Sequence, residues 1–443
     1  MAPVFKKGQR CECANYRPIS LTCVASKIME HIIASSIMRH ANHHNMLYVR
    51  QHGFRAAHSC ETQLIEFIDD VTNTTQNRLQ TDVCVLDFSK AFDKVGHRRL
   101  VQKLKWYGID GAVNEWIEDF LHERQQAVVV DGLKSSSRPV LCGVPQGSVL
   151  GPCLFLFYIN DIAQGLHSTT RLFADDAMIY LAVRDEGDAK LLQKDLDTLA
   201  HWESKWMMEF HPGKCEVISI GRGRKPKCYE YTLHGQQLKH VDTVKYLGVR
   251  ISHDLRWDSH VDAITAKANQ SLNFLRRNIK IGNPGIKEHA YKSLVRPILE
   301  YSQTVWDPHT ISASARVEAV QRRAARFVTN QYDRTASVSD MLGRLQWEPL
   351  VERRRQARLV MFHKIHSNAV AVSMPLQSKG HIVPTRTENS QAYVVPSSRT
   401  DYHRLSFFPR TAREWNGLPE SAVLIASSDS FRLSVQKGAG SAL

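Results

Sequence analysis

The stretch RLFADDAMIY, residues 171–180, places two aspartates side by side between two apolar segments. Apolar arms around a short polar centre predict a β-hairpin, with Asp175 and Asp176 at the turn. Aspartate tolerates the positive φ that a tight hairpin requires. At a turn both carboxylates can reach one point, where their mutual repulsion raises the pKa of each unless a cation lies between them. The stretch therefore predicts a site for a positively charged partner.

The segments around this hairpin predict an α+β fold. In chain order, the sequence favours a doubly buried strand, an amphipathic helical stretch, a strand ending in an Asp-Gly turn, a buried helix, the hairpin, an amphipathic helix and a last strand. These segments are TDVCVLDF (81–88), 97–121, QAVVVDG (126–132), GPCLFLFYINDI (151–162), 171–180, 188–206 and KCEVISIG (214–221). The series strand, helix, hairpin, helix, strand is the split βαβ, ferredoxin-like arrangement rather than a doubly wound parallel sheet.

The second half of the chain has a helical pattern and a basic composition. Residues 259–280 and 314–328 are amphipathic. Residues 271–370 carry 17 Lys and Arg against 8 Asp and Glu. Two interpretations stay open for this charge, namely solvated helix faces or a surface that binds phosphates. After about residue 367, Pro, Ser and Thr interrupt the periodicity and predict a loop-rich tail.

Composition limits the class of protein. A net charge of +14 over 443 residues favours a polyanionic partner, with nucleic acid ahead of an anionic membrane surface. The nine cysteines lack the spacing of a zinc site or a disulfide framework, which predicts reduced, buried thiols. The start of the chain lacks a signal-peptide core, and the longest apolar run, residues 149–159, is too short to span a bilayer. We therefore expect a soluble, non-secreted protein.

A third carboxylate, Asp87, lies in the predicted strand 81–88 and could neighbour the hairpin. Three converging carboxylates are unfavourable without cations, and Mg²⁺ binds one or two carboxylates together with water and substrate phosphates. Two such ions, about 4 Å apart, stabilise the attacking and leaving oxygens of a phosphoryl displacement. The alternative is a turn with two exposed aspartates and an unrelated strand aspartate. The pattern alone leaves both interpretations open.

Several motifs occur in the order of the palm motifs of reverse transcriptases. They are VLDFSKAFDKVGH (85–97), GVPQGSVLGPCLFLFYINDI (143–162), FADD (173–176), PGKCEVISIG (212–221) and KYLGVRIS (245–252). Upstream, residues 15–33 and 51–64 resemble the finger motifs of the non-LTR retrotransposon branch. Segments farther downstream resemble the C-terminal region of Jockey-like and chicken-repeat-like elements. The resemblance covers nearly the whole chain.

This resemblance implies a right-hand polymerase. The fingers and a ferredoxin-like palm would span residues 1–252, a helical thumb 253–335 and a C-terminal extension 336–443. The implied reaction is RNA-directed DNA synthesis on an RNA template with a DNA primer and dNTPs. Two Mg²⁺ ions, for which Mn²⁺ can substitute, are the implied cofactors. Basic thumb helices would hold the template and primer by their backbones.

The resemblance also assigns roles to single residues. Asp87, Asp175 and Asp176 match the metal-binding triad. Phe92 matches the aromatic ring beneath the incoming sugar, which clashes with a 2′-hydroxyl and so selects deoxynucleotides. Without the resemblance, Phe92 would be interpreted as a core aromatic side chain.

Further matches concern the nucleotide and its phosphates. Gln146 and Gly147 match the loop that packs on the incoming nucleotide and the template base. Lys27 and Arg55 match finger cations near the triphosphate, and Lys214 matches the palm lysine that protonates pyrophosphate. For the lysines, the alternative is an ordinary solvated side chain. The hairpin around YLGV, residues 246–249, matches the primer grip.

Two other functions remain open at this stage. One is a retroelement remnant that binds RNA without turnover, and the other, less favoured, is a two-metal nuclease. Relatives ordinarily carry an apurinic-type endonuclease ahead of the polymerase, and the 443 residues contain no segment that resembles one. We therefore expect a chain that polymerises but does not nick its own target.

Overall fold

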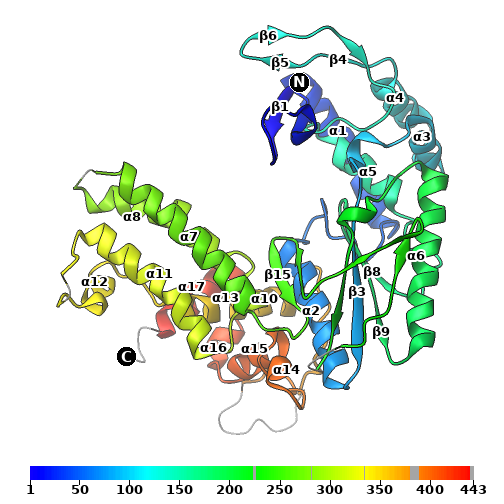
Figure 1. The fold of residues 1–443 in the computed structure, drawn as a ribbon. Helices are drawn as coiled ribbons and strands as arrows, with labels where there is room; N and C mark the ends of the chain where they lie inside the picture. The colour runs from blue at the N-terminus through cyan, green and yellow to red at the C-terminus, as the bar shows by residue number, and fades with distance from the viewer. Residues whose placement is uncertain (223–225, 281, 334, 380–388, 440–443) are drawn as a thin grey trace. The chain divides into compact units, whose positions relative to one another are not determined.

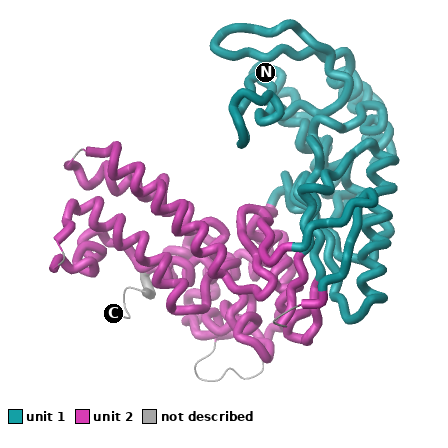
Figure 2. Tube along the Cα trace, in the orientation of Figure 1, with its two compact units in different colours: residues 1–56, 82–217, 228–240 teal, residues 57–81, 218–227, 241–443 magenta. Residues whose placement is uncertain are grey.

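The computed structural model describes residues 1–222, 226–280, 282–333, 335–379 and 389–439 (Figure 1). The chain divides into two compact units (Figure 2). Unit 1 comprises residues 1–56, 82–217 and 228–240, and unit 2 comprises residues 57–81, 218–227 and 241–443. Segments 57–81 and 241–252, which the sequence groups with the fingers and palm, thus belong to unit 2.

A five-stranded sheet with the order β13-β10-β3-β9-β8 forms the centre of the α+β fold. Its strands are β3 (Gln80–Asp87), β8 (Thr169–Phe173), β9 (Asp176–Val183), β10 (Glu216–Ile220) and the two-residue β13 (Lys239–His240). Without β13, the spatial order is fourth, first, third and second strand of the chain. This is the ferredoxin-like order, so the predicted α+β topology is confirmed.

Two predicted helices pack in the same core as the sheet. Helix α5 (Leu150–Ile159) is apolar on all sides and has Pro152 in its first turn, and nine of its residues are buried. Helix α6 (Glu186–Trp206) buries the side chains of only one face. Asp185 caps its start, because the Asp185 side chain accepts hydrogen bonds from two amides of the first turn. Side chains of α5, α6, β3 and β9 belong to one hydrophobic cluster.

The helical stretch expected over 97–121 is present as two helices with a short break between them. These are α3 (His97–Trp106) and α4 (Gly111–Leu121). Gly108 and Gly111 have φ values of +71° and +57°, a conformation that ends a right-handed helix. Helices α3 and α4 pack against each other, and α3 also packs against α5.

Short hairpins and one long helix complete unit 1. The Asp131-Gly132 turn has positive φ at both residues, as predicted, and joins β5 (Val129–Val130) to β6 (Leu133–Lys134). The remaining elements are β1 (Ala2–Phe5), β2 (Tyr16–Ile19), α1 (Val24–His43), β4 (Gln125–Gln126), β7 (Arg138–Pro139), β11 (Thr232–Leu233) and β12 (Gln236–Gln237). Short 3-10 turns lie at Cys13–Asn15, Ala91–Asp93 and Pro212–Lys214.

Unit 2 is mainly helical. The predicted helices are present as α7 (Asp258–Asn278) and α11 (Ile311–Thr329), which pack against each other. The YLGV segment turns between β14 (Thr243–Tyr246) and β15 (Val249–Ser252). The other helices up to residue 367 are α2 (Cys60–Gln76), α8 (Pro284–Leu294), α9 (Arg296–Glu300), α10 (Gln303–Trp306), α12 (Val338–Arg344) and α13 (Leu350–His366).

The C-terminal part differs from the expected loop-rich tail. Beyond residue 400 the chain forms α14 (Asp401–Arg404), α15 (Phe407–Asn416), α16 (Glu420–Val423) and α17 (Ser428–Ala439). Helices α15 and α17 pack against α13, and Trp415 and Phe431 are fully buried. Residues 380–388, within the stretch that favoured a loop, lie outside the described residues. Burial of these aromatic side chains, rather than local periodicity, accounts for the helices.

Part of the basic charge of unit 2 lies in its interior. Arg354 and Arg358 are each 1% exposed, and both pair with Asp307, which is 5% exposed. Arg410 also reaches Asp307, at 3.1 Å, and Arg358 pairs with Glu414 at 2.6 Å. These arginines therefore cannot contribute to a phosphate-binding surface. Exposed basic residues remain on α7 and α11, among them Arg276, Arg277, Arg322 and Arg323.

The structure describes all nine cysteines, and none of them forms a disulfide bond. Cys84, Cys153 and Cys215 are buried, as expected, but five others are exposed, which the packing interpretation missed: Cys11, Cys13, Cys23, Cys142 and Cys228. Among the described helices, none combines the length and apolar character that a membrane span would need.

Candidate active site

The FADD segment forms the tight turn between β8 and β9. Phe173 pairs with Asp176, so Ala174 and Asp175 are the two turn residues and Asp176 is the first residue of β9. The positive φ of the turn, +54°, belongs to Ala174 and not to an aspartate, which corrects the sequence expectation. A positive φ at the first central residue is typical of a type II′ turn, where glycine is preferred. The two adjacent carboxylates thus project from one exposed hairpin end.

Asp87 lies near this turn because it ends β3, the strand next to β9 in the sheet. Desolvation by the surrounding protein raises the pKa of Asp175, and the charge of Asp87 adds to this effect. Desolvation also raises the pKa of Asp176, to about 6, with further contributions from Asp175 and Asp87. The three carboxylates therefore act on one another electrostatically, although solvent reaches part of each side chain.

The nearest ion pair at the site joins Lys214 and Asp87. Lys214 ends the 3-10 turn Pro212–Lys214, and its Nζ lies 3.5 Å from Asp87 Oδ2. The backbone supports this arrangement, because the His211 amide donates to the Asp87 carbonyl at 2.8 Å. Lys214, predicted from the motif, is thus beside the carboxylates.

The donor chemistry of the three carboxylates fits a divalent cation. Carboxylate oxygens are the ligands that Mg²⁺ prefers, and their mutual repulsion is relieved when a cation binds. Among the described residues, no three His, Cys, Asp or Glu side chains are already gathered closely enough to enclose a metal ion. Mg²⁺ commonly completes its shell with water and substrate phosphates, so an open carboxylate site suits it better than a closed cage.

Two cations that the sequence reasoning missed face the carboxylates. Lys6 and Arg17 both lower the pKa of Asp175 and Asp176, against the larger raising effects. They come from the β1–β2 hairpin, in which Val4 pairs with Arg17. Isolated basic residues give no signal in sequence, and only the hairpin pairing brings these two together. Lys27, the finger cation predicted from the motif, lies exposed on the first turn of α1.

The ring of Phe92 is half-buried in the 3-10 turn Ala91–Asp93. It stacks on Phe155 of α5, with ring centres 4.3 Å apart and an interplanar angle of 15°. The exposed ring of Phe54 meets Phe92 edge-on, at 6.3 Å. Core packing therefore fixes one part of the Phe92 ring and leaves another part accessible.

Gln146 and Gly147 form a loop that packs on neighbouring segments. The Gln146 Nε2 group donates to Asp93 Oδ1 at 2.9 Å, and the Gln146 carbonyl accepts from the Ser20 amide at 2.7 Å. Gly147 has a φ of +96°, and an added Cβ would lie 3.0 Å from the Ser20 carbonyl oxygen. Glycine is therefore required here both by the backbone conformation and by the close approach to β2.

A buried glutamate, also missed from the sequence, holds the start of α5. Glu30 is 0% exposed, and its Oε2 atom accepts hydrogen bonds from the amides of Val149 and Leu150 at 2.8 and 3.1 Å. A carboxylate at this end of a helix satisfies free amides and complements the helix dipole. The Gln146–Gly147 loop, which immediately precedes α5, is thereby tied to α1.

Arg55 makes contacts within its own loop. One of its guanidinium nitrogens donates to the carbonyls of Tyr48 and Gln51, at 2.9 and 3.2 Å. Desolvation lowers the pKa of Arg55. These hydrogen bonds give the residue a part in shaping the loop, in addition to the phosphate contact that the motif predicts.

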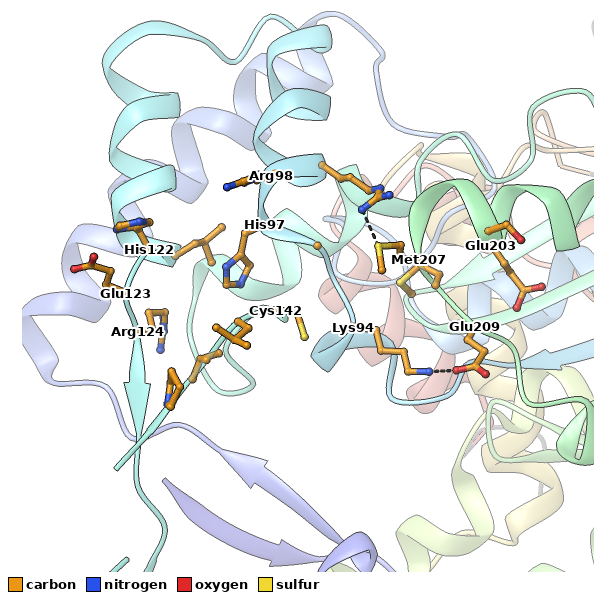
Figure 3. Close-up of a pocket in the computed structure, with 18 of the residues that line it drawn as sticks. Lys94, His97, Arg98, His122, Glu123, Arg124, Cys142, Glu203, Met207 and Glu209 are labelled. Atoms are coloured by element: carbon orange, nitrogen blue, oxygen red, sulfur yellow. Dashed lines mark hydrogen bonds and ion pairs between the residues drawn. The ribbon is translucent and has the colours of Figure 1, made fainter. Parts of the chain in front are cut away.

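A cavity of about 1170 Å³ opens elsewhere in unit 1, around the start of α3 (Figure 3). Basic residues that include Lys94, Arg98 and Arg124 line it, and so do Glu123 and Glu209. Lys94 pairs with Glu209, and none of the three aspartates belongs to the lining. Because acidic side chains balance much of the positive charge of the lining, the charge of the cavity does not favour an anionic ligand.

At one end of a ferredoxin-like sheet, Asp87, Asp175 and Asp176 act on one another electrostatically, which is the arrangement expected of the palm of a nucleic-acid polymerase. The family described as reverse transcriptase (RNA-dependent DNA polymerase) matches residues 4–251, more than half of the chain. The chain belongs to this family. The predicted fold class, a right-hand polymerase, is confirmed.

Curated relatives are polymerases of mobile elements. The chain is 29% identical over 340 residues to the RNA-directed DNA polymerase from mobile element jockey of Drosophila melanogaster. The aligned region covers 73% of this chain and 37% of the relative. It is 28% identical over 338 residues to the probable RNA-directed DNA polymerase from transposon BS of the same species, covering 71% and 36%. The chain thus spans well under half the length of these relatives.

Solved structures show only distant similarity. Apo telomerase from Candida tropicalis aligns with a TM-score of 0.43 and 9% identity, covering 73% of this chain and 54% of that chain. The RNA-dependent RNA polymerase of a human picobirnavirus aligns with a TM-score of 0.41 and 10% identity, covering 78% and 62%. Similarities of this size carry no argument about function.

Proposed function

We propose that this chain is the polymerase part of a non-LTR retrotransposon protein and catalyses RNA-directed DNA synthesis. In this reaction the 3′-hydroxyl of a primer attacks the α-phosphate of a dNTP, and pyrophosphate leaves. The observation that carries the proposal is the match of residues 4–251 to the reverse transcriptase family, and the electrostatic influence of Asp87 on Asp175 and Asp176 supports it. RNA template, DNA primer and dNTPs are the proposed substrates.

The carboxylates of Asp87, Asp175 and Asp176 would bind two divalent ions, and Mg²⁺ is the ion that we expect first. Bound there, such ions supply charge stabilisation for the attacking and leaving oxygens. The support for this assignment is that desolvation, together with a smaller contribution from the neighbouring acids, raises the pKa of Asp175 and Asp176, since both effects are relieved when a cation binds.

The other side chains would position and neutralise the substrate. Lys6 and Arg17 are suited to the negative charge of the triphosphate, and Lys27 is a third candidate. Lys214 would hold a proton at Nζ and pass it to the departing pyrophosphate, as a general acid.

The sugar and base would meet Phe92 and the Gln146–Gly147 loop. The accessible part of the Phe92 ring would lie beneath the sugar and exclude a 2′-hydroxyl. Asp93 and Ser20 fix the loop that would pack on the nucleotide and the template base. Exposed arginines of α7 and α11 would contact backbone phosphates of the template and primer, without reading their sequence.

A primer-extension assay tests the proposal. The full chain is mixed with an RNA template, an annealed DNA primer, four dNTPs and Mg²⁺, and the products are resolved by length. We expect extended primer with the wild-type chain and none with Asp175→Asn. Binding of the template without extension would instead support a remnant that only binds RNA, and a shortened template would support a nuclease.

A further inference from the structure

Residues 50–52, which precede the predicted finger cation Arg55, pair with the edge strand β8 of the sheet. They lie next to the FADD turn, which is called the catalytic turn below. Gln51 bridges Leu172 of β8 in parallel orientation. The Leu172 amide donates to the Arg50 carbonyl at 3.0 Å, and the His52 amide donates to the Leu172 carbonyl at 2.8 Å. Residues 50–52 are therefore fixed by main-chain hydrogen bonds just before the FADD turn begins.

The side chain of Gln51 then reaches the turn itself. Gln51 is 2% exposed, and its Oε1 atom accepts hydrogen bonds from the amides of Gly53 and Ala174, at 2.8 and 2.9 Å. Ala174 is the turn residue with a φ of +54°, an unfavourable value for any residue that carries a Cβ. One buried oxygen thus joins the loop 51–53 to the strained residue immediately before Asp175.

The backbone of Gly53 also lies against the FADD turn. An added Cβ at this position would lie 2.3 Å from the Ala174 nitrogen and 2.9 Å from the Phe173 carbonyl carbon. Both are backbone atoms of the catalytic turn, so they could yield only if the turn moved. The requirement for glycine comes from this close approach, because Gly53 does not have a positive φ.

Arg55 holds the same loop through hydrogen bonds to its backbone. Its guanidinium holds the carbonyls of Tyr48 and Gln51, and the Tyr48 amide in turn donates to Asn160 Oδ1 at 2.7 Å. The loop therefore has fixed partners on both sides, and it can impose its geometry on the turn rather than follow it.

We propose that Gln51 and Gly53 are positioning residues for the carboxylates of Asp175 and Asp176. Gln51 holds the amide of Ala174 so that the turn keeps its positive φ, and Gly53 leaves the space that the turn occupies. Neither residue contacts the reacting atoms. The catalytic consequence rests on the proposed polymerase function, whereas the effect on the turn does not.

The first test measures the turn directly, by hydrogen–deuterium exchange of the peptide that contains Ala174. Gln51→Met keeps the size of the side chain and removes the acceptor oxygen, and Gly53→Ala adds the obstructing Cβ. We expect the Ala174 amide to exchange at least tenfold faster in both variants. The amides of β3 should keep their wild-type rates. Unchanged exchange at Ala174 in folded Gln51→Met would overturn the proposal, whether or not the chain makes DNA.

The second test measures catalysis in primer extension. We expect Gln51→Met to lower kcat at least tenfold, with a KM for dNTP within threefold of wild type. The half-saturating Mg²⁺ concentration should rise at least threefold, a quantity that a smaller fraction of folded enzyme does not change. A wild-type kcat and Mg²⁺ requirement in this variant would contradict the catalytic part.

Asn114→Leu is the matched control for both tests. Asn114 is 1% exposed in unit 1, and its Nδ2 group donates to the carbonyls of Val101 and Ile109, away from the turn. Its loss should lower the melting temperature about as much as Gln51→Met does, without faster exchange at Ala174 and without a higher Mg²⁺ requirement. If Asn114→Leu reproduced both effects, general destabilisation would explain them and the proposal would fail.

If the wild-type chain makes no DNA, the proposed function fails, but the exchange experiment still decides the positioning role.

Discussion

Two acidic sites of this molecule, Asp307 in unit 2 and the carboxylates at the β8–β9 turn in unit 1, have different surroundings. In unit 2, Asp307 is 5% exposed and is met by three arginines, Arg354, Arg358 and Arg410. In unit 1, Asp87, Asp175 and Asp176 lie at a partly solvated strand end. The cations that act on them include Lys214, Lys6 and Arg17, and of these only Lys214 makes an ion pair, at 3.5 Å.

The difference distinguishes a structural cluster from one that is suited to bind a cation. At Asp307 the compensating charge is supplied by the protein and buried with the acid, so a further cation has no role there. At the turn, desolvation and, to a smaller extent, repulsion between the carboxylates raise the pKa of Asp175 and Asp176, so the compensation is incomplete within the chain itself. An incompletely compensated acidic cluster that remains open to solvent is suited to bind ions and substrate.

The largest effect should come from Asp175→Asn. We expect at least about a 10³-fold loss of primer extension, about 4 kcal/mol in activation free energy, because a charge at the reacting centre is removed. The free energy of unfolding should change by less than about 0.5 kcal/mol or increase, since like-charge repulsion is relieved. Denaturant titration and primer extension measure both. Asp110→Asn, at an exposed helix start without a side-chain cap, should change neither.

Asp307→Asn should show the opposite pattern. Two buried arginines and the partly buried Arg410 would lose their shared acid, and we expect unfolding to become easier by about 3–5 kcal/mol. Urea titration of the full chain measures this loss. Asp401→Asn removes an exposed acid that pairs with Arg404 and should cost less than about 1 kcal/mol. Equal effects of the two substitutions would contradict the structural role of the Asp307 cluster.

Acid should weaken unit 2 through His260. Burial lowers the pKa of this histidine to about 4, and the charge of Arg250 contributes. Its Nδ1 atom accepts from the Arg250 amide at 3.2 Å, and its ring lies against Trp306. As pH falls below 6.5, the unfolded chain binds a proton that the folded chain binds only near pH 4, so stability falls across this window.

The expected loss between pH 6.5 and pH 4 is at most about 3 kcal/mol, from 1.36 kcal/mol per unit of pKa. Denaturant titrations at several pH values measure it. His260→Asn keeps an acceptor at the same position and should flatten the dependence. His289→Asn, at an exposed site of α8, should leave the dependence as in the wild type.

The smallest effect concerns the choice of sugar. Phe92→Val should raise the incorporation of ribonucleotides relative to deoxynucleotides about tenfold, roughly 1.4 kcal/mol of discrimination. Competition between dNTP and rNTP in primer extension measures the ratio. Phe120→Val is a suitable control, because Phe120 is also half-buried and stacked, on Trp116. Unaltered selectivity in Phe92→Val would leave the residue a role in packing alone.

The sequence predicted those features that depend on local pattern. The apolar arms around the polar centre of residues 171–180 predicted the β8–β9 hairpin, and the apolar segment 151–162 predicted a buried helix. Each of these two signals lies within about a dozen consecutive residues. For Asp87, Asp175 and Asp176 the pattern left two interpretations open, and the resemblance to reverse transcriptase motifs favoured one shared site.

Features that depend on long-range packing could not be predicted in this way. Lys6, Arg17, Gln51 and Glu30 act on segments far along the chain, so their roles depend on contacts that the local sequence does not show. The helices beyond residue 400 form because Trp415 and Phe431 are buried against other helices, which periodicity alone does not reveal. Ala174, rather than an aspartate, takes the positive φ because neighbouring segments hold it there.

Titration with Mn²⁺, followed by the EPR signal of the free ion, tests the central claim most directly. The wild-type chain and Asp110→Asn should bind the ion alike. The double variant Asp175→Asn, Asp176→Asn, folded as judged by its circular dichroism, should lose that binding. Undiminished Mn²⁺ binding by the folded double variant would show that these carboxylates do not hold the cation, and would contradict the account.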